Sequence, residues 1–549
     1  MMTNKAIARE FNLLANLMEL HGENPFKIRS YQNAYLTIRK LDTPLGDLSA
    51  EELSAIKGIG KAIGDKIQEL LQTGKMQTLE KYRDKTPAGI QDMLEIRGLG
   101  PKKLGVIWKQ LEVEDMGELL YAIHENRLLE LKGFGKKIQA ELKQAIEYFQ
   151  QNRGFFHFAT LEVPGQRLLA ALQQVLPNRP MAFCGDYARH SPTLEKIELL
   201  LGGAIPEDMG VFAGLLDTPV LLKGGISART PDGYPVQLFF AEGEHFPKVL
   251  FTHSSSEAFY QRFNEKFPNF DWTGIENEAA VFHKAGLPFV PAPLREKGSL
   301  LDKPRFGWIT EGDIKGLLHA HSTYSDGQES LETMAKAVRE KGFAYFGITD
   351  HSRSAFYANG LKEERVLQQF EEIDRLNQTY TDGFRILKGI ECDILYDGGL
   401  DYSDEFLKGF DFVIASIHAH LKMDEQKATQ RLIRAIEHPA TNILGHPTGR
   451  LLLSRAGYPV DHRKIIDACA ANQVALELNA NPYRLDLDWT WIEYALEKGA
   501  WIAINPDAHS LKGIEDIHYG ILAAQKGGLG PEQCLNTLDL SGFIEFCNR

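Results

Sequence analysis

The chain has 549 residues, which is too long for one compact domain and predicts three or four. Its 43% hydrophobic and 25% charged residues are typical of a soluble globular protein, and no apolar run reaches the length of a membrane span. The N-terminus lacks the apolar region of a secretory signal, and five widely spaced cysteines form no CxxC pair. These features exclude a disulfide framework and favour the reducing cytoplasm.

The net charge of −13 is unevenly distributed along the chain. Residues 1–150 contain 22 Lys+Arg and 21 Asp+Glu, whereas the other 399 residues contain 39 and 53. The N-terminal segment is therefore the part suited to meet phosphates, and the acidic remainder suits a site that binds cations.

Residues 1–150 have the apolar periodicity of helices and contain a local repeat of three similar turns. The repeats are IKGIGKAIGDKI (56–67), IRGLGPKKLGVI (96–107) and LKGFGKKIQAEL (131–142). Two glycines permit a tight turn, and the next helix start presents free N–H groups to an anion, as in the helix-hairpin-helix element. The repeats predict DNA binding through phosphates without sequence preference. The candidate DNA-binding residues are Gly58, Gly60, Lys61, Gly98, Gly100, Lys102, Gly133, Gly135 and Lys136.

After residue 150 the pattern changes to short strand-like pieces up to about residue 240. A mixed segment follows and ends in the proline-rich stretch AGLPFVPAPLREKGS, which is typical of a domain-end linker. Residues 305–549 alternate strand-like and helix-like segments, which indicates a barrel or a parallel sheet.

Nine potential metal ligands follow apolar, β-prone runs in this last region. They are His319, His321, Asp326, His351, Glu391, His418, His446, Asp507 and His509. Strands that end in such residues bring them to one mouth of a sheet or barrel. One such histidine alone is more often an ordinary core or surface residue, but nine in the same context predict a multinuclear site of a metal-dependent hydrolase. Imidazole and carboxylate together favour Zn²⁺, Mn²⁺ or Fe²⁺ over Mg²⁺ alone.

Residues 315–512 resemble a PHP domain (polymerase and histidinol phosphatase), and the order of segments resembles a bacterial family X DNA polymerase over nearly the whole chain. The resemblance implies a distorted (β/α)7 barrel with three metal ions, Mn²⁺ being preferred, and 3′–5′ exonuclease activity on DNA. It implies His319, His321, Glu391 and Asp507 as ligands of the first ion and as catalytic residues. It implies Asp326, His351 and His509 for the second ion. It implies Glu391, His418 and His446 for the third. Arg353 and Arg450, which follow two of these residues, are candidates for phosphate contact, and the alternative is that they are ordinary surface arginines.

The segment that should form the polymerase palm departs from the family pattern. Gly185-Asp186-Tyr187-Ala188-Arg189 stands for Gly-Ser-x-Arg-Arg, and Lys196-Ile197-Glu198 stands for the Asp-x-Asp pair. Gln237 occupies the third carboxylate position, and Glu195 points to the opposite face from Glu198. We therefore expect no Mg²⁺ at the palm and a lost polymerase activity, unless one strand is misregistered. Residues 4–80 resemble the family's small lyase domain with Lys66 at the Schiff-base position, although an ordinary solvated helix lysine is slightly favoured.

The predicted fold is multidomain, α followed by α/β. Its predicted parts are a helical domain at 1–80, a second helical domain at 81–152, a degenerate palm at 153–242, a thumb-like part at 243–303 and a PHP phosphoesterase domain at 304–549. The predicted function is a DNA repair protein, a monomer, that trims 3′ ends or gapped DNA in a Mn²⁺-dependent manner, with Zn²⁺ or Fe²⁺ as alternatives. The alternatives are a phosphoesterase on a small ester of the histidinol phosphate type, an active gap-filling polymerase and a non-catalytic DNA scaffold.

Overall fold

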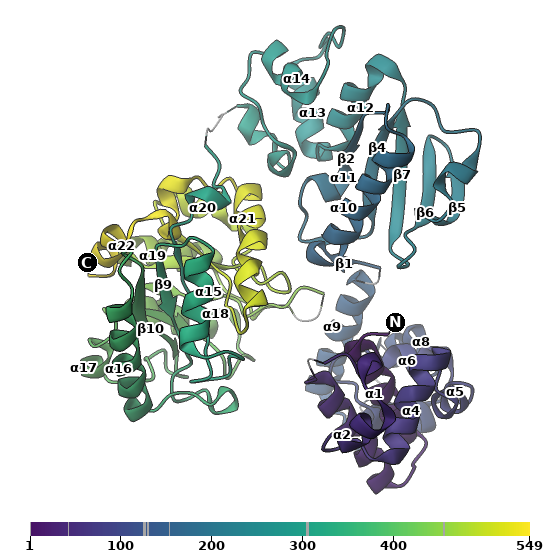
Figure 1. The fold of residues 1–549 in the computed structure, drawn as a ribbon, viewed down its shortest axis with the longest axis vertical. Coiled ribbons are helices and arrows are strands. Elements are labelled where there is room, and N and C mark those ends of the chain that lie inside the picture. The colour runs from purple at the N-terminus through teal and green to yellow at the C-terminus, as the bar shows by residue number, and fades with distance from the viewer. Residues whose placement is uncertain are drawn as a thin grey trace. The chain divides into compact units, whose positions relative to one another are not determined.

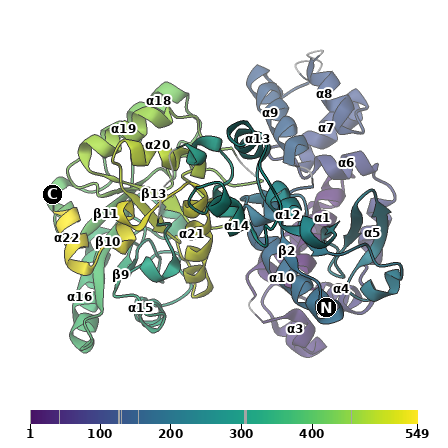
Figure 2. The ribbon, with the colours of Figure 1, turned by 90° about the horizontal axis from the view of Figure 1, so that it is seen from above.

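The computed structural model describes residues 2–41, 43–124, 128, 131–152, 154–302, 307–453 and 456–548. The chain divides into two compact units, Met1–Arg153 and Gly154–Arg549. Figures 1 and 2 show the first unit as helices and the second as a mixture of helices and strands. None of the helices in the described ranges combines the length and the apolar character needed to cross a membrane. The finer division into five parts stays a prediction.

Helices build the first unit around a single apolar core. Thr3 caps the first helix by accepting from the Ala6 N–H, and a Ser49–Glu52 capping box starts the third. The helices are α1 (Asn4–Leu20), α2 (Pro25–Arg39), α3 (Ala50–Ala55), α4 (Lys61–Thr73), α5 (Gln77–Arg83), α6 (Ala88–Met93), α7 (Pro101–Leu111), α8 (Met116–His124) and α9 (Lys136–Asn152).

The second unit begins with a small mixed sheet in the order β2-β4-β7-β6-β5. Its central pair, β4 and β7, is parallel and its other neighbours are antiparallel. The strands are β2 (Met181–Phe183), β4 (Ile197–Gly202), β5 (Asp217–Leu222), β6 (Gly225–Arg229) and β7 (Pro235–Ala241). A separate two-stranded sheet pairs β1 (Phe156–His157) with β3 (Thr193–Leu194), and the helices of this part are α10 (Phe158–Val175) and α11 (Gly185–Ala188).

A helical segment follows with α12 (Phe246–His253), α13 (Glu257–Lys266) and α14 (Glu278–Lys284). Its core is aromatic and encloses the fully buried Arg295. The Arg295 guanidinium lies 5.2 Å from the ring centroids of Phe251 and Phe282 and pairs with Glu278. The buried charge is thus compensated by one carboxylate and by ring faces.

The rest of the second unit is the expected (β/α)7 barrel. Seven parallel strands lie in the order β14-β13-β12-β11-β10-β9-β8, and the bridge between Ala320 and Ala508 nearly closes the sheet on itself. The strands are β8 (Gly316–Leu317), β9 (Tyr345–Ile348), β10 (Arg385–Asp393), β11 (Phe412–Ser416), β12 (Ile443–Leu444), β13 (Ala475–Asn479) and β14 (Ile502–Asn505). The helices are α15 (Leu331–Glu340), α16 (Glu363–Thr379), α17 (Asp404–Leu407), α18 (Glu425–Ile436), α19 (His462–Asn472), α20 (Ile492–Glu497), α21 (Ile517–Lys526) and α22 (Leu540–Cys547).

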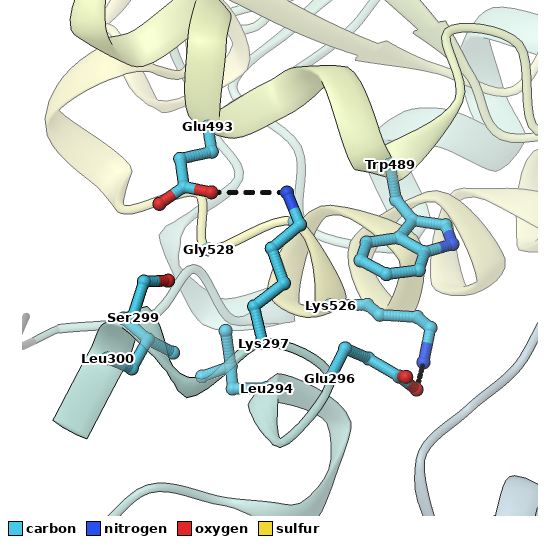
Figure 3. Close-up of a pocket in the computed structure, with 10 residues that line it drawn as sticks. Leu294, Glu296, Lys297, Ser299, Leu300, Trp489, Glu493, Lys526 and Gly528 are labelled. Atoms are coloured by element: carbon cyan, nitrogen blue, oxygen red, sulfur yellow. Dashed lines mark hydrogen bonds and ion pairs between the residues drawn. The ribbon is translucent and has the colours of Figure 1, made fainter. Parts of the chain in front are cut away.

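Ion pairs hold the barrel against the segments that precede it within the second unit. Figure 3 shows Lys526 of α21 on Glu296, and Lys297 lies 3.2 Å from Glu493 of α20. These residues line a cavity of about 30 Å³. His518, also on α21, bonds Glu162 of α10 at 2.9 Å. Charged contacts therefore form much of this junction.

Candidate metal centre

The carboxyl ends of the parallel strands position the nine predicted ligands. His319 and His321 follow β8, His351 follows β9, His418 follows β11, His446 follows β12, and Asp507 and His509 follow β14. Glu391 lies inside β10, and Asp326 lies in the loop after β8. Parallel strands end at one face of a barrel, so six of the seven strands, all but β13, bring these side chains to one place.

Glu391 is the centre of the cluster. Its Oε1 lies 2.9 Å from His446 Nε2, 3.0 Å from His418 Nε2 and 3.3 Å from His319 Nε2. Its Oε2 lies 2.9 Å from His351 Nδ1. One buried carboxylate thus faces imidazoles from four other strands, which is the arrangement expected of a bridging ligand.

All nine residues fall into four overlapping groups whose ligand atoms lie within 4.8 Å of one another. The groups are His319, His321 and Asp507; His321, Asp326, His351 and His509; His319, Glu391 and His446; and His351, Glu391 and His418. The first two groups resemble the implied first and second ion sites, with His321 shared between them. His418 and His446, which the resemblance places on one ion, fall in separate groups that share Glu391.

Several buried atoms of the cluster have no hydrogen-bond partner among the described residues. These atoms are His319 Nε2, His321 Nδ1, His446 Nδ1 and Glu391 Oε2. Buried polar groups are normally hydrogen-bonded, so lone pairs that converge without a donor fit divalent cations. Six imidazoles and three carboxylates, with no thiolate among them, are donors for Mn²⁺, Zn²⁺ or Fe²⁺.

The electrostatics of the cluster are dominated by its carboxylates. Burial opposes ionisation of Glu391, yet the nearby histidines, His418 first, hold its pKa well below the usual range. Burial lowers the pKa of His418, but the Glu391 carboxylate raises it, and the net result is a pKa of about 10. Burial lowers the pKa of His321 to about 3, which keeps this imidazole neutral. A cation that binds here replaces protons that the carboxylates otherwise retain on the histidines.

Buried residues behind the ligands orient them. Glu477 Oε2 accepts from His319 Nδ1 at 2.6 Å, and Asp393 Oδ1 accepts from His418 Nδ1 at 2.9 Å. Each bond leaves the Nε2 of its imidazole to face the cluster. Sequence reasoning missed both carboxylates, although a charged residue inside the apolar strand VALELN was a usable signal for Glu477.

Arg484 is a third residue that the sequence pattern did not indicate. Its Nη1 lies 2.9 Å from Asp507 Oδ2, and its buried Nε has no hydrogen-bond partner in the part of the chain that the structure describes. The guanidinium therefore stands directly beside a candidate ligand with one donor uncommitted.

The two arginines that were predicted instead contact other loops. Arg353 bonds Asp401 at 3.3 Å and pairs with Glu363. Arg450 donates to the Arg484 carbonyl at 3.0 Å and pairs with Asp488. These contacts tie loops together at the rim of the barrel, and a phosphate contact by either arginine stays a prediction.

Two ligands occupy strained backbone conformations. His319 has φ 60° and Asp507 has φ 52°, in the left-handed region that non-glycine residues rarely adopt. They flank Ala320 and Ala508, where the first and last strands meet. The Ala508 N–H donates to the His319 carbonyl at 3.2 Å, and the His321 N–H donates to the Ala508 carbonyl at 2.8 Å. Strain of this kind concentrates at functional sites.

The segment predicted to form the palm has one carboxylate at the positions where the family pattern has three. Glu198 of β4 is the register partner of Gln237 on β7, which agrees with the predicted strand alignment. The Glu198 carboxylate accepts from the Asp186 N–H at 3.0 Å, and a Cβ on Gly185 would lie 2.0 Å from it. Arg189 forms an ion pair with Glu296, with 3.1 Å between Arg189 Nε and Glu296 Oε1. Within the described residues, every His/Asp/Glu group that can hold an ion lies in the barrel.

The three repeated turns of the first unit share one local structure. Gly58, Gly98 and Gly133 have φ values of 97°, 86° and 92°. The residue after each glycine is buried, and its N–H donates to the carbonyl oxygen three residues earlier. The pairs are Ile59 with Ile56, Leu99 with Ile96 and Phe134 with Leu131. Gly60 and Gly100 precede α4 and α7 without any side-chain cap, so the N–H groups in the first turn of each helix stay available to an anion, apart from Pro101, which has none. Lys61, Lys102, Gly135 and Lys136 are exposed.

Lys66 lies on α4 and is half-buried. Its Nζ donates to Thr78 Oγ1 at 2.8 Å. This contact is compatible with an ordinary helix lysine, and a lyase role stays a prediction.

Comparisons with known proteins agree with both units. The model of a helix-hairpin-helix domain matches residues 2–76, and the model of a PHP domain matches residues 318–481. The DNA polymerase/3′-5′ exonuclease PolX of Bacillus subtilis (strain 168) is 34% identical over 574 residues, which cover 100% of both chains. A probable phosphatase of Acetivibrio thermocellus is 30% identical over 199 residues, 35% of this chain and 74% of the relative. The probable phosphatase YcdX of Escherichia coli (strain K12) is 29% identical over 229 residues, 40% of this chain and 85% of the relative.

Proposed function

The chain belongs to the bacterial family X DNA polymerases that carry a PHP domain, and from this membership we propose that it is a metal-dependent 3′–5′ exonuclease acting on DNA. The observation that carries the proposal is the cluster of nine candidate ligands around Glu391, all of them buried or half-buried except the exposed Asp326. We propose Mn²⁺ as the preferred metal, with Zn²⁺ or Fe²⁺ as alternatives, and three ions in the cluster.

The protein's own residues would hold and orient the reacting groups. The bound ions would activate a water and neutralise charge on the attacking and leaving oxygens at phosphorus. His319, His321, Glu391 and Asp507 would hold the first ion, and Glu477 and Arg484 would fix His319 and Asp507 in place. Arg484, with its uncommitted Nε, is better placed for a phosphate than Arg353 or Arg450.

The helical unit supplies the reason to prefer DNA over a small ester. Three similar turns with exposed lysines, two of them before helices that lack a side-chain cap, suit the phosphates of a gapped duplex or a 3′ end, without sequence preference. A phosphatase acting on a small molecule has no use for them. The probable phosphatases that match the barrel alone make a small phosphate ester the second candidate.

We propose that polymerase activity is lost. The two-metal reaction needs carboxylates to hold the ions, and Lys196 and Gln237 replace two of the three. The lysine charge repels a cation at this position. Glu198 alone, held against the Gly185 turn, does not form such a site.

One set of assays separates these candidates. Labelled single strand, gapped duplex and histidinol phosphate are incubated with Mn²⁺ or with EDTA. We expect Mn²⁺-dependent shortening of DNA from the 3′ end, and His446→Ala should remove most of it with DNA affinity nearly unchanged. His283→Ala, an exposed histidine on α14, is the control and should keep full activity.

The same His446→Ala protein tests the palm because it does not degrade the primer. With Mg²⁺ and all four deoxynucleotides on gapped DNA, we expect no template-directed extension. Full exonuclease activity in this variant would contradict the metal centre, extension would contradict the loss of polymerase activity, and turnover of histidinol phosphate alone would favour the second candidate.

A further inference from the structure

Two loops at the carboxyl ends of neighbouring barrel strands expose large aromatic side chains. Phe356, in the loop after β9, is 88% exposed, and Tyr396, in the loop after β10, is 56% exposed. The first loop follows the ligand His351, and the second follows the strand that holds Glu391. Single exposed apolar residues are common on proteins, but these two follow neighbouring strands, β9 and β10, at the end of the barrel that carries the candidate ligands.

The loop that holds Phe356 is fastened to the metal centre on both sides. The Leu361 N–H donates to the His351 carbonyl at 2.8 Å, so the loop leaves from and returns to one ligand. Asn359 Nδ2 donates to the carbonyl of Tyr324 at 3.2 Å, close in sequence to the ligand Asp326. The Cα of Phe356 therefore lies within about 18 Å of the Cα of the candidate ligand His351, because five residues span no more than that.

The loop that holds Tyr396 is a tight turn. Ile394 pairs with Leu400, and the Leu395 N–H donates to the Gly399 carbonyl at 2.7 Å. The Tyr396 ring lies 5.3 Å from the His420 ring and 3.7 Å from Lys427 Nζ. A cation over one face of the ring leaves the tyrosine positioned and still more than half exposed.

Asp401 connects the two loops. It is 3% exposed and accepts from the Ser354 N–H at 2.7 Å, from Ser354 Oγ at 2.6 Å and from Arg353 Nε at 3.3 Å. The aromatic side chains thus stand on a preformed support, and a ligand that stacks on them does not have to order the loops first.

We propose that Phe356 and Tyr396 form a stacking platform for unpaired nucleobases at the 3′ end of a DNA strand. The inference rests on the proposed exonuclease function and names its preferred substrate, a single-stranded 3′ end. Every base offers a π face, so stacking on aromatic side chains is independent of sequence. Stacking also needs no positive field, which suits the acidic C-terminal part of the chain. A base-paired terminus keeps its bases in the duplex and does not use the platform.

The test compares leucine and aromatic substitutions in the full-length protein with Mn²⁺. Phe356→Leu and Tyr396→Leu keep apolar bulk but remove the ring, whereas Phe356→Trp and Tyr396→Phe keep it. We expect the leucine variants to raise the KM for a single-stranded oligonucleotide roughly 5- to 150-fold for each lost stack. The aromatic variants, and Leu367→Ala at an exposed residue of α16, should keep the KM unchanged.

Two further readouts separate the platform from the chemistry. Hydrolysis of the p-nitrophenyl ester of thymidine 5′-monophosphate, which has no neighbouring base, should be unchanged in the leucine variants. An oligonucleotide with 5-iodouracil near its 3′ end should photocrosslink in EDTA to peptides that contain Phe356 or Tyr396.

The outcomes distinguish the two proposals. Normal KM values in the leucine variants together with no crosslink to either loop would overturn the platform and leave the exonuclease intact. If the unsubstituted protein hydrolyses neither the oligonucleotide nor the nucleotide ester, the proposed function fails and the platform with it.

Discussion

The buried carboxylate of Glu477 accepts hydrogen bonds from two of the candidate ligands, His319 and His446. Its carboxylate accepts from His319 Nδ1 at 2.6 Å and from the His446 N–H at 3.3 Å. Asn479 and Asn505 donate to the same carboxylate at 3.1 Å each. A fully hydrogen-bonded buried carboxylate fixes the imidazole that it contacts and raises its basicity toward a metal.

For this residue we predict that Glu477→Gln lowers Mn²⁺ affinity roughly 10- to 100-fold. The neutral amide replaces the charged carboxylate that accepts from His319 Nδ1 and orients the imidazole. Titration calorimetry with Mn²⁺ measures the change without any substrate. Glu497→Gln, at an exposed residue of α20, is the matched control. Equal affinities in the two variants would mean that Glu477 only fills space.

Residues that orient the candidate ligands, such as Glu477, could not be predicted from the sequence. The pattern of His, Asp and Glu at strand ends identified all nine members of the candidate metal cluster, since the period of a strand and the face of a barrel follow from local pattern. The partners of Arg353 and the role of Glu477 depend on which loops meet after the barrel closes. The contact between Ala320 and Ala508 joins residues far apart in the chain, and no local pattern specifies it.

Among the elements, the repeated turns of the helical unit depend on glycine at one position each. Gly98 has φ 86° and no heavy atom within 4 Å of a built Cβ, so substitution meets backbone strain and no clash. The sequence predicted these turns correctly, because paired glycines before a helix start are a local signal.

We predict that Gly98→Ala weakens binding to gapped DNA several-fold, because the turn shifts the N–H groups at the start of α7 away from the phosphate. The strain costs about 1–2 kcal/mol. Gly74→Ala is the control, since Gly74 has φ 70° at the end of α4, equal open space and no place in a repeat. Fluorescence anisotropy with labelled DNA measures both. If both variants lose affinity equally, loss of stability and not the turn is the cause.

At the scale of the molecule, the second unit depends on charged contacts between the barrel and the segments before it. His518 bonds Glu162 of α10 at 2.9 Å and Glu311 at 2.8 Å. The hydrogen bond to Glu162 raises the pKa of His518, and burial opposes this effect. The net result is a rise from 6.5 to about 9. The folded state favours the protonated imidazole, so its stabilisation is complete below about pH 6.5 and is lost as the pH rises through about 9.

We therefore predict that His518→Gln lowers the melting temperature of the full-length protein by about 2 °C at pH 6 and has no effect at pH 10. His245→Gln, at an exposed histidine, should change neither value. Calorimetry at the two pH values measures the difference between variants. A penalty of the same size at both pH values would show that His518 acts by packing and not by charge.

The position of Glu391 has a consequence for how such a protein can change over generations. A palm whose carboxylates stand on two neighbouring strands can lose them one by one, because each replacement leaves a packed and soluble sheet. The barrel has no such gradual route. One glutamate lies against histidines from four other strands, so its replacement disturbs several candidate ligands at once and removes the partner that these buried groups share. A lineage is then expected either to inherit the whole cluster or to discard the domain, and partly dismantled versions should be rare among descendants.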